Sequence, residues 1–138
     1  MPAEPQPPIV LAMVLADTVL VDVATGKNTI QGTYQNLLAP AFPYTHPAIV
    51  VYVALTEGHG ATTVQLRLVD RDEARPPIFE LESEVSFPDP LTDVEIVFAQ
   101  PRVVFPEPGD YRLQLFAGHA PLLERRLEIS PEEDSEND

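Results

Sequence analysis

The chain lacks cysteine and tryptophan, and its 138 residues include a single lysine. Without cysteine there is no disulfide, no thiolate metal ligand and no cysteine nucleophile, so the fold must be stabilised by packing alone. One domain of this length buries roughly two thirds of the surface that its unfolded chain would expose. A sizeable core is therefore expected within a single domain.

Basic residues are scarce: 8 Lys and Arg stand against 22 Asp and Glu, and the formal net charge is -14. The longest basic run is Arg125-Arg126. Binding to nucleic-acid phosphates or to an anionic membrane surface requires clustered Lys and Arg. We therefore expect no nucleic-acid partner and no membrane partner.

Long hydrophobic runs are also missing. The most apolar stretch near the N-terminus, Ile9 to Ala16, is too short to span a bilayer. It follows Glu4 and a proline-rich leader instead of the basic residues that open a secretory signal. We interpret it as a buried strand and predict a cytoplasmic protein.

No segment has a helical period of useful length, and 16 prolines would interrupt one. Instead, eight short apolar segments recur between turns, and most of them alternate apolar and polar residues with a period of two, which is typical of an antiparallel β-sandwich. The eight segments are 9–22, 28–33, 49–55, 63–69, 78–87, 94–98, 111–115 and 123–129. The predicted organisation is a Pro-rich arm at 1–8, one sandwich domain at 9–129 and an acidic, disordered tail at 130–138.

The stretch from Pro47 to Asp72 is the predicted centre of the fold. Its first part, Ile49 to Leu55, is apolar without a break, while Thr63 to Val69 alternates. These patterns predict a central strand and a half-exposed one. The intervening Gly58-His59-Gly60 suits a tight turn, so we expect the two strands to pair as a hairpin.

Two stretches resemble known proteins. Pro108-Gly109-Asp110-Tyr111-Arg112-Leu113-Gln114-Leu115, followed by Gly118 and the strand Leu122 to Ile129, resembles the last hairpin of bacterial immunoglobulin-like domains. The resemblance implies an all-β, immunoglobulin-like antiparallel sandwich of about seven to nine strands, in which Tyr111 is structural.

The N-terminal half is similar to a small bacterial family known only as a domain of unknown function. The similarity rests on Leu15-Ala16-Asp17, Gly26-Lys27, Gln31-Gly32-Thr33-Tyr34 and Ala41-Phe42-Pro43. Together the two resemblances cover roughly residues 9 to 129. They imply no catalytic residue.

Metal binding is tested by the positions of the three histidines. In a sandwich the connections alternate between its two ends, which places His59 and His119 at one end and His46 at the other, roughly 30 Å away along a strand. A three-histidine zinc site is therefore excluded, and His59 and His119, with Asp22 nearby, remain weak candidates. We predict no metal and no cofactor.

An acidic group after the second central strand, Asp70, Asp72 and Glu73, offers oxygen ligands of the kind that calcium prefers. Arg71 and Arg75 are interleaved with these carboxylates, and no glycine makes a tight ligand loop. We interpret the group as a charged connection.

Nucleophilic catalysis requires a serine or threonine beside a histidine base and an oriented carboxylate. The serines are Ser83, Ser86, Ser130 and Ser135, and none lies in a Gly-x-Ser-x-Gly elbow. No glycine-rich phosphate loop is present either. We therefore do not expect an enzyme.

The loop from Tyr34 to Pro47 is long and rich in large apolar residues. Its candidate partner-binding residues are Tyr34, Leu38, Phe42 and Tyr44. Either these side chains cap the open end of the sandwich, or Phe42 and Tyr44 form an exposed aromatic patch for a protein partner.

The predicted function is a non-enzymatic protein-interaction or assembly module that binds another protein or itself. The alternative is a small-ligand or carbohydrate-binding domain that uses the histidine-bearing end. Only Phe87 and Phe116 would supply aromatic side chains there.

Overall fold

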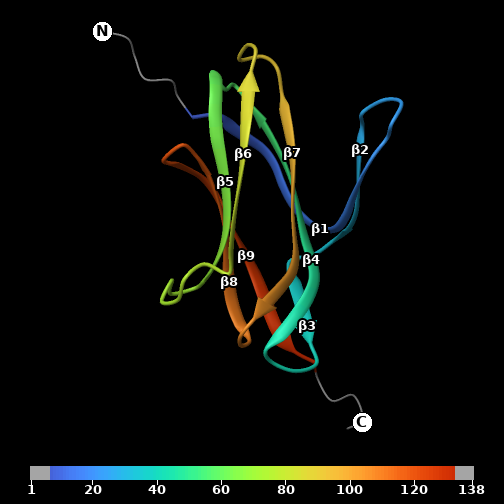
Figure 1. Cartoon of the computed structure of the whole chain (residues 1–138), viewed down its shortest axis with the longest axis vertical. Helices are drawn as coiled ribbons and strands as arrows, with labels where there is room; N and C mark the ends of the chain where they lie inside the picture. Colours follow the sequence, from blue (N-terminus) through green and yellow to red (C-terminus); the bar gives the residue numbers. More distant parts are fainter. Residues whose placement is uncertain (1–6, 133–138) are drawn as a thin grey trace.

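The computed structural model describes residues 7–132, and in that range it contains nine strands and no helix (Figure 1). The strands are β1 (Ile9–Val21), β2 (Asn28–Thr33), β3 (Asn36–Ala39), β4 (Tyr44–Thr56), β5 (Gly60–Asp70), β6 (Phe79–Phe87), β7 (Val94–Phe105), β8 (Gly109–Ala117) and β9 (Ala120–Pro131). A search of the same residues finds no helix that could cross a membrane.

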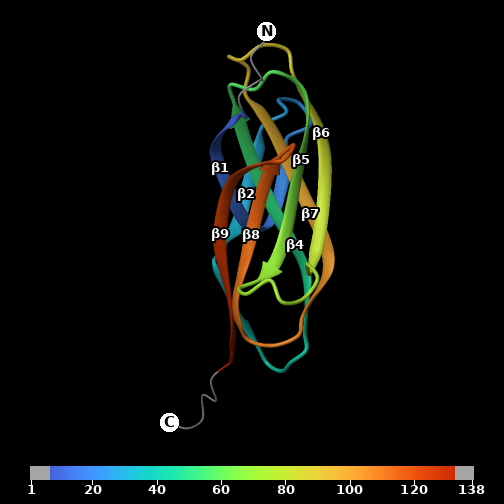
Figure 2. The same ribbon diagram turned by 90° about the vertical axis from the view of Figure 1, so that its left-hand side faces the viewer.

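The strands form two sheets that pack face to face, which confirms the predicted β-sandwich (Figures 1 and 2). The four-stranded sheet has the order β2-β1-β4-β7, and the five-stranded sheet has the order β3-β9-β8-β5-β6. All neighbouring strands are antiparallel except β3 and β9, which are parallel.

The core lies between the inner faces of the two sheets. Val51, Val53 and Leu55 of β4 point into it and are fully buried. Leu66 and Leu68 of β5 are equally buried on the opposite side. Period-two alternation brings these residues to one face of each strand, so the sandwich is held by an apolar layer that both sheets share.

The predicted hairpin between Ile49–Leu55 and Thr63–Val69 is wrong. Its strands are parts of β4 and β5, which lie in different sheets and do not pair. The turn instead carries the chain from one sheet to the other, so that the apolar faces of both strands meet across the core. Residue patterning cannot separate these two arrangements, because both bury the same alternating positions.

Gly58 makes this crossing possible. A Cβ atom at this position would overlap with the ring of Phe87, which is 2% exposed. The adjoining Glu57 has a positive φ of 59°, and its amide donates to the carbonyl of Pro90 at 3.0 Å. The crossing is therefore packed against the β6–β7 connection, as expected if both lie at one end of the sandwich.

The expected sorting of the connections between two ends agrees with the structure. At one end, the amide of Gly118 also donates to the carbonyl of Thr63 at 2.8 Å. The segments 40–43, 71–78 and 106–108 lie at the opposite end (Figure 1).

The segment 34–47 is not the single loop that was predicted. Residues 36–39 form β3, which pairs with the end of β9, and β4 begins at Tyr44. β9 correspondingly runs to Pro131, so Ser130 and Pro131 belong to the sheet and not to the predicted tail. Pro8, in the predicted arm, is buried. The remaining parts of the arm and tail, 1–6 and 133–138, lie outside the described residues.

β1 bends in its middle, where its pairing partner changes. Up to Ala16 it pairs with β4, and from Ala16 onward it pairs with β2. Gly32 has a φ of +73°, and a Cβ there would overlap with the Asp17 carboxylate. Residues 17–33 thus leave the body as a two-stranded ribbon, called here the β1–β2 ribbon (Figure 1).

Gly58→Ala is expected to lower the free energy of unfolding by about 1–3 kcal/mol, because the new methyl group overpacks the Phe87 ring. In a Phe87→Leu background this cost should shrink, since the pair is in contact. The control is Gly60→Ala, where space is open but φ is +63°; it should cost about 1–2 kcal/mol in either background. Urea unfolding of the variants measures both effects, and an undiminished Gly58→Ala cost in the double variant would contradict the packing explanation.

Candidate functional site

The four residues predicted to bind a partner do not form one exposed patch. Tyr34, Phe42 and Tyr44 are half-buried and pack against the core, while Leu38 on β3 is 56% exposed. Of the two readings of this segment, the geometry favours the cap for the three aromatic residues. Leu38 remains at the surface beside the end of β9.

The cap is a chain of aromatic contacts that runs along the end of the sandwich. His46 lies between Tyr34 and Tyr44: its ring centroid is 6.1 Å from that of Tyr34 and 5.8 Å from that of Tyr44. Tyr44 stacks on Phe105 at 6.4 Å, and Phe105 meets Tyr111 edge-on at 5.0 Å. Such ring contacts stabilise the folded state by more than the apolar area that they bury. The aromatic residues of the cap therefore have a structural role.

The hydroxyl of Tyr34 has no hydrogen-bond partner among the described residues, although it is buried. Burial, followed by the nearby Asp17 carboxylate, raises the pKa of Tyr34 to about 12. His46 receives opposite influences: burial lowers its pKa, and Asp17 partly counteracts this. Its Nδ1 lies 2.9 Å from the Tyr44 hydroxyl.

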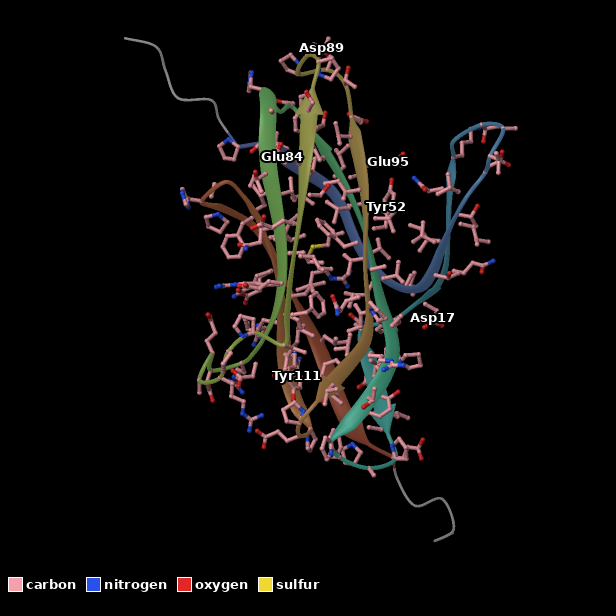
Figure 3. All side chains as sticks on the ribbon, in the orientation of Figure 1. Asp17, Tyr52, Glu84, Asp89, Glu95 and Tyr111 are labelled. Atoms are coloured by element: carbon pink, nitrogen blue, oxygen red, sulfur yellow. The ribbon has the colours of Figure 1, made fainter. Side chains whose placement is uncertain are left out.

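Tyr111 occupies the corner between β7 and β8 (Figure 3). Its hydroxyl donates to the backbone carbonyl of Glu107 at 2.6 Å, and its side chain is 2% exposed. A tyrosine that bonds to backbone a few residues upstream is a known device of sandwich corners. The structural role implied for Tyr111 thus has a direct geometric basis.

The weak metal candidates His59 and His119 are both exposed turn residues. Within residues 7–132, no three His, Asp or Glu side chains are close enough together to hold a metal ion.

Several surface hollows among the described residues are large enough to consider as ligand sites, and one of about 540 Å³ is lined by Leu38, Ser130, Pro131 and Glu132. A second, of about 430 Å³, is lined mainly by charged residues, among them Asp72 of the β5–β6 connection, Glu107 of the β7–β8 connection and Arg126 on β9. Another of about 360 Å³ lies beside Phe116 and Leu122. Phe116 is covered by the Arg67 guanidinium at 5.1 Å, and Phe87 is buried, so neither predicted aromatic offers a free ring for a sugar.

The outer face of the five-stranded sheet is charged. One row across it runs through Glu80, Arg67, Gln114 and Glu124, on four adjacent strands. Arg67 donates to Gln114 at 2.8 Å, and Gln114 donates to Glu124 at 3.0 Å. Most charged groups on this face are paired, although the buried Nε of Arg112 has no hydrogen-bond partner among the described residues.

The outer face of the four-stranded sheet is apolar. The equivalent row consists of Val14, Tyr52 and Val97. We call the surface around this row the apolar face; its residues are Ala12, Val14, Ala16, Val50, Tyr52, Ala54, Val97 and Ala99. Val97 is 41% exposed, whereas Ala16 and Ala54 of the same face are buried, at 0% and 7%.

Glu95 on β7 lies opposite Ala54, one outward position along the strand from Val97. The Tyr52 hydroxyl donates to its carboxylate. Partial burial and this hydrogen bond raise the pKa of Tyr52 to about 12. Figure 3 shows both side chains on the side of the sheet that faces the β1–β2 ribbon.

The β1–β2 ribbon stands over the apolar face. In Figure 1 it lies beside β4 and β7, and in Figure 2 it lies behind them. From Asp17 onward β1 pairs with β2 alone, so no strand pairing joins the ribbon to β4 or β7 among the described residues. The ribbon and the face are two apolar surfaces on one side of the molecule.

Sequence reasoning did not identify the apolar face, although β4 carries its signal. The unbroken apolar run from Ile49 to Leu55 predicts a strand that is covered on both sides. In this chain the core covers the inner side, while the outward Val50 and Tyr52 are partly exposed and the outward Ala54 is buried.

Comparison with known proteins gives a family for this chain. A family of unknown function (DUF6941) matches residues 11–130. The chain belongs to this family. No curated protein matches the sequence, so membership of the family does not assign a role to the chain.

Solved structures of low sequence identity share the fold. A β-glucosidase from Listeria innocua in complex with glucose is 12% identical, with a TM-score of 0.50. The same enzyme in complex with isofagomine gives a TM-score of 0.49. Each match covers 86% of this chain but 16% of the glucosidase chain. The similarity concerns the fold of one part of a much longer enzyme.

Replacement of Tyr111 and replacement of Tyr34 by phenylalanine should change the stability of the protein differently. Tyr111→Phe removes a buried hydrogen bond and is expected to cost about 1–2 kcal/mol in unfolding free energy. Tyr34→Phe removes a hydroxyl without a partner and should be neutral or stabilising by up to about 1 kcal/mol. Urea denaturation of both variants measures the difference; equal losses would contradict the assigned contacts.

Acidification should destabilise the protein through His46. Because burial lowers the pKa of this imidazole in the folded state, the folded chain favours the neutral ring. The resulting stability is present above the ordinary pKa near 6.5 and is lost as the pH falls through the folded value. Unfolding measured at pH 7.5 and 5.5 should show a smaller loss for His46→Gln than for the unmodified chain, while His59→Gln, at an exposed turn, should not differ from it.

Proposed function

We propose that this protein is a non-enzymatic interaction or assembly module, and that it contacts another protein or itself through the apolar face and the β1–β2 ribbon. The observation that carries the proposal is the contrast between the two outer faces. One consists of paired charges and the other of Val14, Val50, Tyr52 and Val97. Contiguous apolar surface of this kind marks interaction sites in otherwise polar proteins.

The aromatic content supports the same interpretation. Tyr52 lies at the centre of the apolar face between Val14 and Val97. Tyrosine is enriched at the centre of protein interfaces because its ring buries apolar area while its hydroxyl finds a polar partner. Here Glu95 already supplies that partner, so the ring is held in place before a partner binds.

The Tyr111 corner supports an immunoglobulin-like relationship for the sandwich, and such sandwiches often serve as binding scaffolds. We place the module in the cytoplasm, in keeping with its lack of cysteine. The alternative, a carbohydrate or small-ligand site, has less support because Phe87 is buried and Phe116 is covered by Arg67.

The proposal predicts that a photoreactive residue in the apolar face will cross-link to a partner, and that one on β9 will not. A photoreactive residue is placed at Val97 or, as control, at Leu123 on β9, which is 39% exposed against 41% for Val97. In cells that produce the full chain, ultraviolet light should yield a discrete adduct from position 97, with this chain or with another protein, and none from position 123.

The specificity of that adduct is checked by competition. Excess unmodified chain should suppress it, while Val97→Asp should compete at least about tenfold less well, because a charge would be buried at the contact. Leu123→Asp should compete like the unmodified chain. A yield at position 97 no higher than at position 123 would contradict the proposed function.

A further inference from the structure

The β1–β2 ribbon exposes more apolar surface than a free two-stranded ribbon can support. Leu20 is 50% exposed, Val21 59% and Val23 101%. A two-stranded hairpin without a packing layer is marginal in water, and from Asp17 onward this ribbon pairs with no third strand among the described residues. Its apolar side chains are thus available to a surface outside the chain.

The ribbon is nonetheless well formed at its tip. One carboxylate oxygen of Asp22 accepts the amides of Ala24 at 2.8 Å and Thr25 at 2.9 Å. The backbone of Asp22 bonds to Gly26 and Lys27 at 2.7 and 2.8 Å. A tip fixed in this way presents Val23 and Lys27 with little ordering cost on binding.

We propose that the ribbon and the apolar face are the two halves of one interface, and that the occupant is a second copy of this chain, related by a two-fold axis. The ribbon of each copy lies on the apolar face of the other. This inference rests on the proposed function and names its partner. A two-fold arrangement satisfies both surfaces on both copies, because each contact occurs twice.

Charge complementarity favours a second copy over an unrelated partner. Lys27, the one lysine of the sequence, lies at the ribbon tip, and Glu95 lies at the apolar face. Neither forms an ion pair within residues 7–132. Packing a ribbon from one copy on the face of another brings these opposite charges toward each other at both contacts.

The remaining surface argues against other ways for two copies to meet. The chain carries a net charge of -14, and β6 places Glu80, Glu82 and Glu84 along the edge of the five-stranded sheet. Like charges facing each other disfavour association there. The apolar face, with Glu95 as its charged group, is where two acidic copies can approach closely.

Charge reversal in two chains gives a decisive test. Sedimentation from about 1 μM to about 500 μM, a range that covers micromolar dissociation constants, should show a monomer–dimer equilibrium for the full chain. Lys27→Glu and Glu95→Lys, both at exposed positions, should each raise the dissociation constant by about tenfold or more. A mixture of the two variants should form heterodimers with nearly the original affinity, because each contact then joins opposite charges.

Controls separate the contact from folding and from general charge effects. Val23→Asp, at the exposed tip, should weaken the dimer, whereas Leu91→Asp, 90% exposed at the β6–β7 connection, should not. Circular dichroism should show unchanged sheet content for all variants.

Three results would overturn the inference. The first is a chain that stays monomeric at every concentration. The second is a dimer whose dissociation constant does not change when Lys27, Glu95 or Val23 is replaced. The third is a mixture of the Lys27→Glu and Glu95→Lys variants that does not regain the original affinity. If the chain is monomeric but position 97 still cross-links to a different protein, the interaction module stands and the second copy is wrong. If position 97 gives no adduct either, both fail.

Discussion

The structure depends on the contact between the inner faces of β4 and β5 across the core. Three residues join these strands, and the fully buried Val51, Leu55 and Leu66 lie on the faces that meet. Such a short connection can cross between sheets only if backbone and ring approach closely, which Gly58 under Phe87 permits. Once β4 and β5 are in different sheets, β1 and β7 must add beside one, and β6 and β8 beside the other.

Much of this fold could be predicted from alternation alone. Each predicted segment of the second half lies on an observed strand, although β7 continues to Phe105 beyond the predicted 94–98, and the Gly109–Tyr111 corner was recognisable from its residues. The pairing of β4 and β5 could not be predicted, because a hairpin and a crossing between sheets bury identical positions. β3 could not be predicted for a different reason. Its four residues pair in parallel with β9, which is distant in the sequence, and the residues of so short a strand show no pattern that indicates such a pairing.

The apolar face was harder to predict than the fold because the aromatic residues concentrate in a different segment. Tyr34, Phe42 and Tyr44 look like an interaction patch in the sequence, but they complete the end of the core. The apolar face instead consists of alanines, valines and one tyrosine on three strands. Each strand alone looks like ordinary core, and only the sheet order shows that their outward residues form a continuous surface.

The acidic composition and the apolar face are parts of one arrangement. A chain of net charge -14 repels copies of itself at most orientations, and this repulsion protects an exposed apolar surface from indiscriminate aggregation. Association then requires the docking of a small apolar area that carries complementary charge, as Lys27 and Glu95 would provide. The scarcity of lysine strengthens this selectivity, because Lys27 stands alone at a tip that Asp22 holds in a fixed turn. Negative charge over the body and apolar contact at one face together favour a single mode of assembly.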